Sequence, residues 1–328
     1  MCRLSTRTFA RPLYGGRSAE AKLFRQRRKR SNPGQRPELA EHTLPRLAVF
    51  AERFPDSWVG TALREHREDR DGLLASLLES LRGDSRVRAA WMWGSFGKGE
   101  ADDLSDLDPW LLVEDAAVGE MGASLLSYAR RTGNFISGGE STNNAPADGG
   151  YFSSLHEGRH GLLHVDCYWQ GRSAGVEIPE TALLFDRLNA PTADACDPPL
   201  VLPTSTEPTD DGQGITRGIG FTWLMLSIAA KYLARDPQSD MSLMLYPEPG
   251  FEEAAALLGL ADVASSTDWS IPERCDEKVD RLRHLVGETA QLTTAAIGRG
   301  LDLSPTNALC MERYLDLVAG IVNSNRGR

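Results

Sequence analysis

The 328-residue chain lacks long apolar runs and paired cysteines. Its longest apolar run, residues 221–230, is interrupted by Thr222 and Ser227 and is much shorter than the ~20 residues that a membrane span needs. We therefore expect no membrane partner and no secretory signal. The five cysteines show no Cys-x-x-Cys pair and no metal-ligand spacing, which fits a reducing cytoplasm. They are Cys2, Cys167, Cys196, Cys275 and Cys310.

Positive charge is scarce outside the N-terminal segment. The net charge is −10, yet residues 1–36 hold eleven basic residues and one acid, Glu20. The acidic remainder argues against a nucleic-acid polymerase, whose channel needs many Lys and Arg side chains for phosphates. Residues 1–37 are expected to form a basic, disordered arm. The arm could grip nucleic acid or anionic surfaces, act as an organelle-targeting segment, or be upstream sequence from a misjudged start codon.

The most informative stretch is residues 94–108, GSFGKGEADDLSDLD. Residues 87–93 are apolar apart from Arg88 and predict a buried strand, so Gly94 and Ser95 lie where a strand turns into a helix. Glycine allows a close approach of the backbone to phosphate, and the N–H groups of such a turn bind anions. Ser95 adds a hydroxyl donor. The turn therefore predicts a phosphate site.

Asp106 and Asp108 follow this turn and precede a strand at residues 110–113. Two-residue spacing in an extended segment places both carboxylates on one face, about 6 to 7 Å apart at the backbone. Mg²⁺ prefers hard oxygen ligands, and two such ions ~3.5 to 4 Å apart can hold the attacking and leaving oxygens of a phosphoryl displacement. The pair predicts a magnesium site.

The whole string resembles the nucleotidyltransferases related to DNA polymerase beta, and within them the branch that adenylylates aminoglycosides and lincosamides. That branch shows Gly-Ser, a basic residue, Gly-Glu-Ala, three variable positions and Ser-Asp-x-Asp. Lys98, residues 99–101 and residues 105–108 fall in these places, with Ser105 opening the last motif. Pro109 departs from the pattern because it replaces the usual apolar residue, although proline is acceptable as the first residue of a strand.

The resemblance also implies a third carboxylate on a later strand, and Asp166 within residues 162–169 supplies one. Alternation places His164, Asp166 and Tyr168 on one face of that strand. The resemblance implies that Asp166 is a metal ligand. Asp166 could also take the proton of the incoming hydroxyl, and His164 could hydrogen-bond beside it.

Each acid has a simpler interpretation. The 102–108 segment could be an ordinary acidic turn that carries its carboxylates into solvent, and Asp166 could face water on the outer side of the sheet. His156, His160 and His164 recur at a spacing of four, but Gly158 and Gly161 favour a turn between two strands over a metal site. We therefore expect no zinc.

The expected fold class is α+β, with a mixed β-sheet nucleotidyltransferase core flanked by helices and followed by an all-helical domain. Residues 71–81 carry a leucine stripe at helical spacing that should pack on the sheet. Further strands are expected at 151–155 and 161–169, a helix at 115–131, and a loop at 138–150 that could border an acceptor pocket or simply face solvent. The expected domains are the nucleotidyltransferase domain at 38–190, a Pro-rich linker at 191–213 and a helical substrate- and nucleotide-binding domain at 214–328.

Helices are predicted in the C-terminal domain at 216–235, 251–260, 276–297 and 305–323, the last with Ser304 as its cap and Pro305 in its first turn. On the first of these helices Lys231 and Arg235 are four residues apart, about 6 Å along the axis, so both could bind one triphosphate. They could equally be solvated charges at the end of a helix. Trp223 is expected in the core.

Together these features predict a cytoplasmic enzyme that moves a nucleoside monophosphate, expected to be AMP from ATP although another NTP is possible, to a hydroxyl of a small molecule. An antibiotic is the leading acceptor, two Mg²⁺ ions assist, and pyrophosphate leaves. The predicted nucleotide-binding residues are Gly94, Ser95, Lys98, Ser105, Lys231 and Arg235. The alternatives are a protein AMP-transferring regulator of a toxin and a catalytically silent nucleotide-binding module. Nucleic acid is not expected as a partner except through the basic arm.

Overall fold

The computed structural model describes residues 50–54, 57–141, 144–146, 148–174, 178–179, 183–188, 192–193, 211–245 and 247–326, all of which lie in the unit Thr43–Arg328. The predicted basic arm, 1–37, lies outside these residues, as does most of the predicted linker. The division into a sheet domain and a helical domain therefore stays a prediction. None of the helices in the described ranges combines the length and the apolar character needed to cross a membrane.

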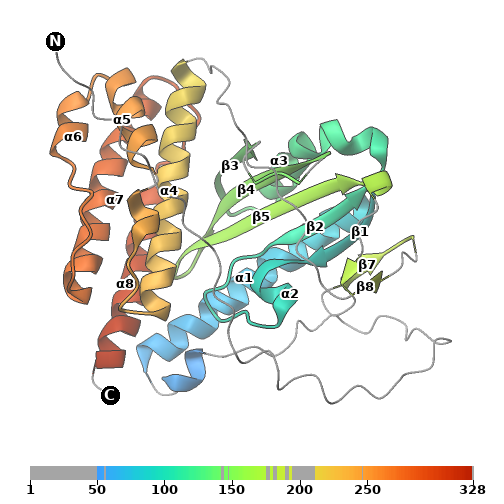
Figure 1. Ribbon diagram of the computed structural model, residues 1–328, viewed down its shortest axis with the longest axis horizontal. Helices are drawn as coiled ribbons and strands as arrows, with labels where there is room; N and C mark the ends of the chain where they lie inside the picture. The colour runs from blue at the N-terminus through green and yellow to red at the C-terminus, as the bar shows by residue number, and fades with distance from the viewer. Residues whose placement is uncertain are drawn as a thin grey trace, which may run out of the picture. The chain divides into compact units, whose positions relative to one another are not determined.

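A six-stranded mixed sheet carries the acidic residues (Figure 1). Its order is β3-β4-β5-β2-β1-β7, in which β2 and β5 run parallel and the other neighbours are antiparallel. The strands are β1 (Val87–Met92), β2 (Pro109–Val113), β3 (Phe135–Ser141), β4 (Gly149–Gly158), β5 (Gly161–Gly171) and β7 (Leu183–Asp186). A separate pair joins β6 (Ile178–Pro179) to β8 (Thr192–Ala193). The mixed sheet confirms the predicted α+β class.

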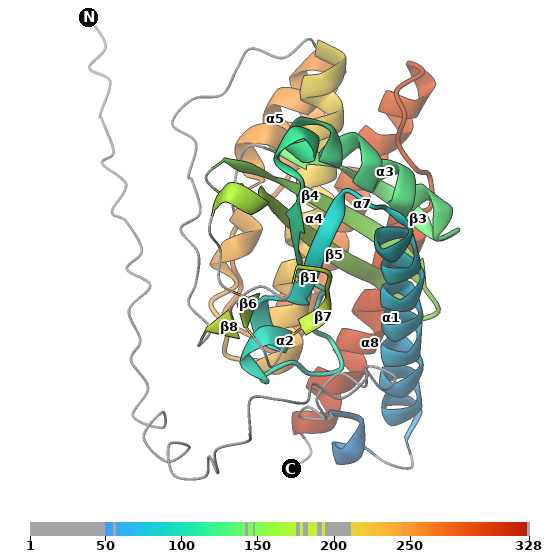
Figure 2. The same ribbon diagram turned by 90° about the vertical axis from the view of Figure 1, so that its right-hand side faces the viewer.

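Two helices cover one face of the sheet. The leucine stripe of α1 (Trp58–Gly83) and the apolar side of α3 (Met121–Arg131) pack on inward-facing residues such as Leu111, Val165 and Cys167, and Figure 2 shows α1 alongside the sheet. The predicted stripe is confirmed, since all five of its leucines are buried: Leu73, Leu74, Leu77, Leu78 and Leu81. The predicted helix at 115–131 is a short 3₁₀ turn, η3 (Asp115–Glu120), followed by α3.

The C-terminal helices pack into a bundle beside the sheet (Figure 1). Trp223 is fully buried there and donates its indole N–H to Thr293 Oγ1 at 3.1 Å, which confirms its core position. The helices are α4 (Asp211–Arg235), α5 (Glu248–Leu257), α6 (Ala261–Ser266), α7 (Cys275–Gly298) and α8 (Asn307–Arg326). Short 3₁₀ turns are η2 (Phe50–Arg53), η4 (Arg172–Ala174) and η6 (Ser242–Leu245).

Three local predictions are wrong. Residues 138–141 belong to β3 rather than to a loop, because Gly138 lets β4 approach so closely that an added Cβ would lie 2.6 Å from Ser153 O. The predicted helix at 251–260 ends at Leu257, since Gly259 adopts a φ of +69°. Helix α8 begins at Asn307 rather than at Pro305, because Ser304 Oγ accepts the N–H of Thr306 and shapes a turn before the helix.

Candidate active site

The acids are brought together by an extra bridge ahead of β2. Leu107 N donates to His164 O at 3.0 Å, and Asp166 N donates to Leu107 O at 2.8 Å. Leu107 and Val165 point into the core between the sheet and α1. Because side chains alternate along extended chains, Asp106 is placed on the same side of the sheet as His164 and Asp166.

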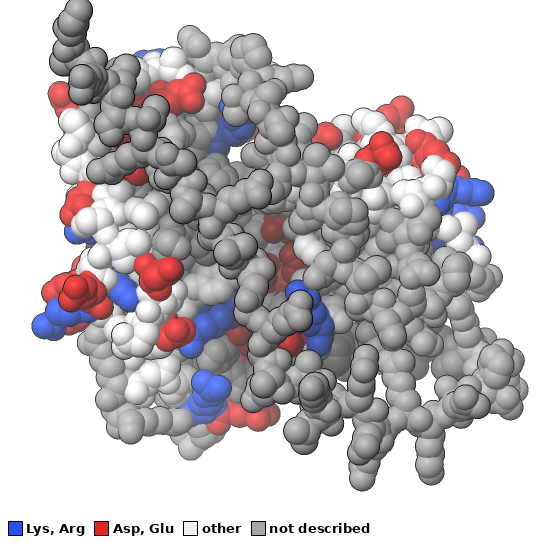
Figure 3. Space-filling model, in the orientation of Figure 1, with Lys and Arg blue, Asp and Glu red and all other residues white. Residues whose placement is uncertain are grey.

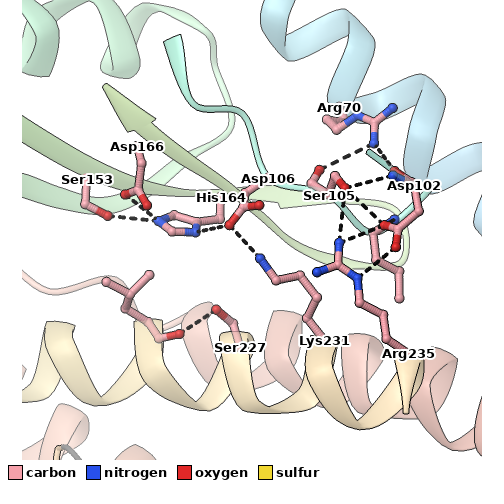
Figure 4. Close-up of polar contacts among 12 residues, drawn as sticks. Arg70, Asp102, Ser105, Asp106, Ser153, His164, Asp166, Ser227, Lys231 and Arg235 are labelled. Atoms are coloured by element: carbon pink, nitrogen blue, oxygen red, sulfur yellow. Dashed lines mark hydrogen bonds and ion pairs between the residues drawn. The ribbon is translucent and has the colours of Figure 1, made fainter. Parts of the chain in front are cut away.

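Asp106, His164 and Asp166 form a compact cluster of potential metal ligands. One ligand atom from each residue lies within 4.8 Å of the others. Figure 4 shows the imidazole of His164 between the two carboxylates. Its Nε2 lies 2.8 Å from Asp166 Oδ1, which confirms the predicted contact, and its Nδ1 lies 3.4 Å from Asp106 Oδ2. The acids therefore do not project into solvent, and Asp166 does not face outward.

Asp108 lies against the Gly94 turn rather than inside this cluster. A Cβ added to Gly94 would meet Asp108 Oδ2 at 2.3 Å, and Gly94 has a φ of +61°, so both space and backbone conformation require glycine. Burial, followed by the charges of Asp106 and Asp166, raises the pKa of Asp108 well above its usual value. A buried carboxyl group beside two other acids is an arrangement that a bound cation would stabilise.

The predicted strand-to-helix turn is present at Gly94 and Ser95, which open the short helix α2 (Gly94–Lys98). The Ser95 hydroxyl oxygen is inaccessible to solvent and has no hydrogen-bond partner in the described ranges. Buried hydroxyl groups normally form a hydrogen bond, so the Ser95 hydroxyl is suited to hydrogen-bond a ligand. Lys98 is exposed at the end of α2.

Lys231 reaches the acids from α4. Its Nζ lies 2.5 Å from Asp106 Oδ2, and its side chain is 9% exposed (Figure 4). Burial alone would raise the pKa of Asp106, but the charge of Lys231 and the interaction with His164 outweigh burial and keep that pKa below its usual range. Lys231 is therefore not a solvated charge at the end of a helix.

The raised pKa of His164 indicates a negative electrostatic potential at its imidazole. Burial alone would lower the pKa of this imidazole, but the charge of Asp166 and the contact with Asp106 outweigh burial and raise the pKa to about 10. The field that retains a proton here is also one that attracts a divalent cation. Two carboxylates and an imidazole at this spacing fit such an ion.

Arg235 pairs with the loop that carries the acids. Its guanidinium donates to Asp102 through Nε at 2.7 Å and Nη2 at 2.9 Å, and Nη2 also donates to Ser105 Oγ at 3.1 Å. The buried Arg70 of α1 donates to Asp102 O at 2.7 Å. Arg235 and Ser105 thus shape the loop here, and their predicted role in binding nucleotide stays a prediction.

Sequence reasoning does not single out three residues of this site. Asp102 lies inside the motif but looks like any acidic turn residue, while Arg70 is one polar position on an otherwise ordinary helix. Tyr151 donates its hydroxyl to Asp166 Oδ1 at 2.5 Å from the adjacent strand β4. Only the strand register, which sequence does not specify, places Tyr151 beside Asp166.

A cavity opens at this cluster, lined by Asp106, His164 and Lys231 together with His66, Ser105 and Tyr314, among others. Acidic side chains are visible deep in the middle of this face, between the C-terminal helices and the sheet, with basic side chains nearby (Figure 3). In this cavity Asp106, which precedes β2, and His164 of β5 lie near the cationic Lys231 of α4.

Comparison with known proteins supports no conclusion about the function of this chain. No protein family matches the chain, and no curated protein matches it. Among the solved structures that resemble it are two at 11% identity and a TM-score of 0.24. One is a CdnE cyclic dinucleotide synthase from Elizabethkingia meningoseptica with GTP and Apcpp, with 82% of this chain and 99% of that chain covered. The other is a STING-associated CdnE c-di-GMP synthase from Capnocytophaga granulosa, at 85% and 91%. At this TM-score the likeness carries no argument about this chain.

Proposed function

We propose that the protein transfers a nucleoside monophosphate, AMP from ATP, to a hydroxyl group of a small molecule. The observation that carries the proposal is the convergence of Asp106 and Asp166 within one cluster, beside Asp108 and the Gly94 turn. Acids on two neighbouring strands next to a phosphate-binding turn suit an in-line displacement at phosphorus.

The triphosphate would lie along the Gly94 turn. The buried, unpartnered hydroxyl of Ser95 would donate to a phosphate oxygen, and the first N–H groups of α2 would point toward the same ligand. Lys231 of α4, which lines a cavity together with Asp106 and His164, would add a positive charge. To do so, it would exchange its contact with Asp106 for one with phosphate.

The carboxylates of Asp106, Asp108 and Asp166 would hold two divalent cations, for which Mg²⁺ is the simplest choice. Bound there, the ions would neutralise charge on the phosphates and on the leaving pyrophosphate. Asp166 would orient the acceptor, since Tyr151 and His164 both contact its Oδ1 and fix its position. Its second oxygen, Oδ2, would accept the hydroxyl proton.

The reaction follows from this placement. The acceptor oxygen forms a bond to the α-phosphorus, the bond from that phosphorus to the bridging oxygen breaks, and pyrophosphate leaves. The cluster of acids would also attract a cationic acceptor. Aminoglycosides are therefore the first acceptors to test, and lincosamides are the second.

The test is a transfer assay with ATP labelled in the α-phosphate, Mg²⁺ and a panel of aminoglycosides and lincosamides. We expect a labelled product and pyrophosphate, with Asp106→Asn at least about 100-fold slower because the variant loses a ligand of the cations that stabilise transition-state charge. Asp103→Asn is the control, since Asp103 instead accepts Ala51 N at 2.8 Å and supports the fold. Transfer at the wild-type rate in Asp106→Asn would refute the proposal. A label that moves only to protein would point to a protein acceptor.

A further inference from the structure

We propose that His164 is itself a ligand of the cation held at Asp106, and that this mixed donor set selects a first-row transition cation such as Mn²⁺ over Mg²⁺. The inference rests on the proposed function, because it concerns the cation of that same site. It goes further by adding a nitrogen ligand to a set of carboxylates and by naming the class of metal.

The two ring nitrogens of His164 have different surroundings. Nε2 lies 2.8 Å from Asp166 Oδ1 and 3.0 Å from Ser153 Oγ, which suits an N–H that donates to the carboxylate. Nδ1 is buried, makes no hydrogen bond to the described residues, and lies 3.4 Å from Asp106 Oδ2. With one proton kept on Nε2, a cation that replaces the proton on Nδ1 would bind the lone pair of Nδ1 beside a carboxylate oxygen.

The surroundings hold this imidazole in place. The side chain of His164 is 8% exposed, and its carboxylate partner Asp166 is fixed in turn by the hydroxyl of Tyr151. A metal-binding histidine usually donates its other ring N–H to a carboxylate, which sets both its tautomer and its orientation. The chain Tyr151, Asp166 and His164 reproduces that arrangement.

The donor set decides the metal. Carboxylate oxygens alone suit Mg²⁺, Ca²⁺ and Mn²⁺, whereas imidazole nitrogen favours first-row transition metals. Mn²⁺ satisfies both requirements, because it accepts carboxylates readily and binds imidazole better than Mg²⁺ does. Asp106 Oδ2 and His164 Nδ1 would bind the ion directly, and Asp166 would orient the imidazole through Oδ1.

The experiment measures Mn²⁺ bound to the full chain in the presence of a non-hydrolysable ATP analogue. Electron paramagnetic resonance counts free Mn²⁺, and electron spin-echo modulation detects nitrogen bound to the metal. Protein containing ¹⁵N-histidine assigns any such nitrogen to histidine. The test variant is His164→Gln, whose amide retains a donor toward Asp166 but has no ring nitrogen for the metal. The matched control is His160→Gln, since His160 lies on the same hairpin and pairs with Glu65 instead.

We expect histidine nitrogen modulation in the wild type and in His160→Gln, and none in His164→Gln. We also expect Mn²⁺ affinity to fall about 10- to 100-fold in His164→Gln, the scale seen when groups around a metal site are lost. Wild-type Mn²⁺ affinity should exceed Mg²⁺ affinity at least tenfold, and that preference should shrink in the variant. Bound Mn²⁺ without nitrogen modulation in the wild type would overturn the inference but leave the proposed function standing. If neither Mn²⁺ nor Mg²⁺ bound even with the ATP analogue, both would fail.

Discussion

Arg235 and Asp102 form a two-bond ion pair that ties helix α4 to the loop preceding the acids. Their side chains are 25% and 11% exposed, and the two residues are 133 positions apart in the chain. The pair therefore links the C-terminal helices to the segment that positions Asp106. Arg235 could shape the loop or bind phosphate, and substitution distinguishes these two roles because each predicts a different effect on stability and on KM.

Arg235→Ala should lower the free energy of unfolding by about 2 kcal/mol, because a charged hydrogen-bonded pair is lost. It should also reduce turnover, because the loop that precedes Asp106 is no longer held in place. Arg235→Lys should recover only part of the loss, since lysine lacks the planar fork. The measurements are chemical unfolding, kcat and KM for ATP. An increase in KM alone, with stability and kcat unchanged, would show that Arg235 binds phosphate instead.

Gly94→Ala should impair activity far more than Gly99→Ala. Both glycines have positive φ values, +61° and +71°, so each substitution carries similar backbone strain of about 1–2 kcal/mol. Only at Gly94 would the new Cβ collide with Asp108, because nothing lies within 4 Å of the corresponding position at Gly99. The ratio of kcat/KM between the two variants checks this, and equal losses would mean that the contact with Asp108 is unimportant.

Tyr151→Phe should reduce kcat about 10-fold while KM for ATP stays near its wild-type value. The hydroxyl of Tyr151 holds Asp166, and the loss of such an orienting group disturbs the site without removing a nucleotide contact. Tyr168→Phe is the control, because Tyr168 stacks on Trp110 in the same sheet and its hydroxyl makes no hydrogen bond to the described residues. Similar kinetics for the two variants would show that the hydroxyl of Tyr151 does not position Asp166 for the reaction.

Stability should depend on pH through Asp84 at the end of α1. Hydrogen bonds from Arg86, together with one from the Tyr128 hydroxyl, lower the pKa of Asp84 to about 2. A carboxyl group with a depressed pKa stabilises the fold above its unfolded pKa of ~3.9, and this contribution is lost as the pH falls toward 2. Asp84→Asn should therefore cost about 1–3 kcal/mol at pH 7 and progressively less below pH ~4. Urea unfolding of both proteins across this range checks the trend, and a pH-independent difference would exclude Asp84 as its source.

Much of the sheet and the stripe of α1 could be predicted because apolar periodicity reports burial directly. The predicted strands near 87, 110 and 161 and the leucines of α1 are in their expected places. The second half of β3, residues 138–141, could not be predicted, because its two glycines resemble a loop and its pairing depends on β4, a partner that local pattern does not reveal. Similarly, nothing in the pattern of α8 distinguishes a capping serine at 304 from a turn that precedes the helix.

At the site, the motif residues and the contact between His164 and Asp166 could be predicted, but the contacts between distant parts of the chain could not. Alternation along β5 placed His164 beside Asp166, and the motif identified Asp106 and Asp108. The contact between Lys231 and Asp106 joins positions 125 residues apart, so it depends on how α4 packs against the sheet. Tyr151 and Arg70 were missed for the same reason: each acts through a neighbour that only the tertiary structure supplies.

The central claim is that Asp106, Asp108 and Asp166 hold cations against a triphosphate bound at Gly94 and Ser95. The most direct test is a crystal structure with a non-hydrolysable ATP analogue and Mn²⁺, whose anomalous scattering locates the ions. The account predicts anomalous peaks at these three carboxylates, phosphate oxygens on the Ser95 hydroxyl, and Lys231 turned from Asp106 toward phosphate. Nucleotide bound elsewhere, or Mn²⁺ absent from the acids while Lys231 still pairs with Asp106, would contradict it.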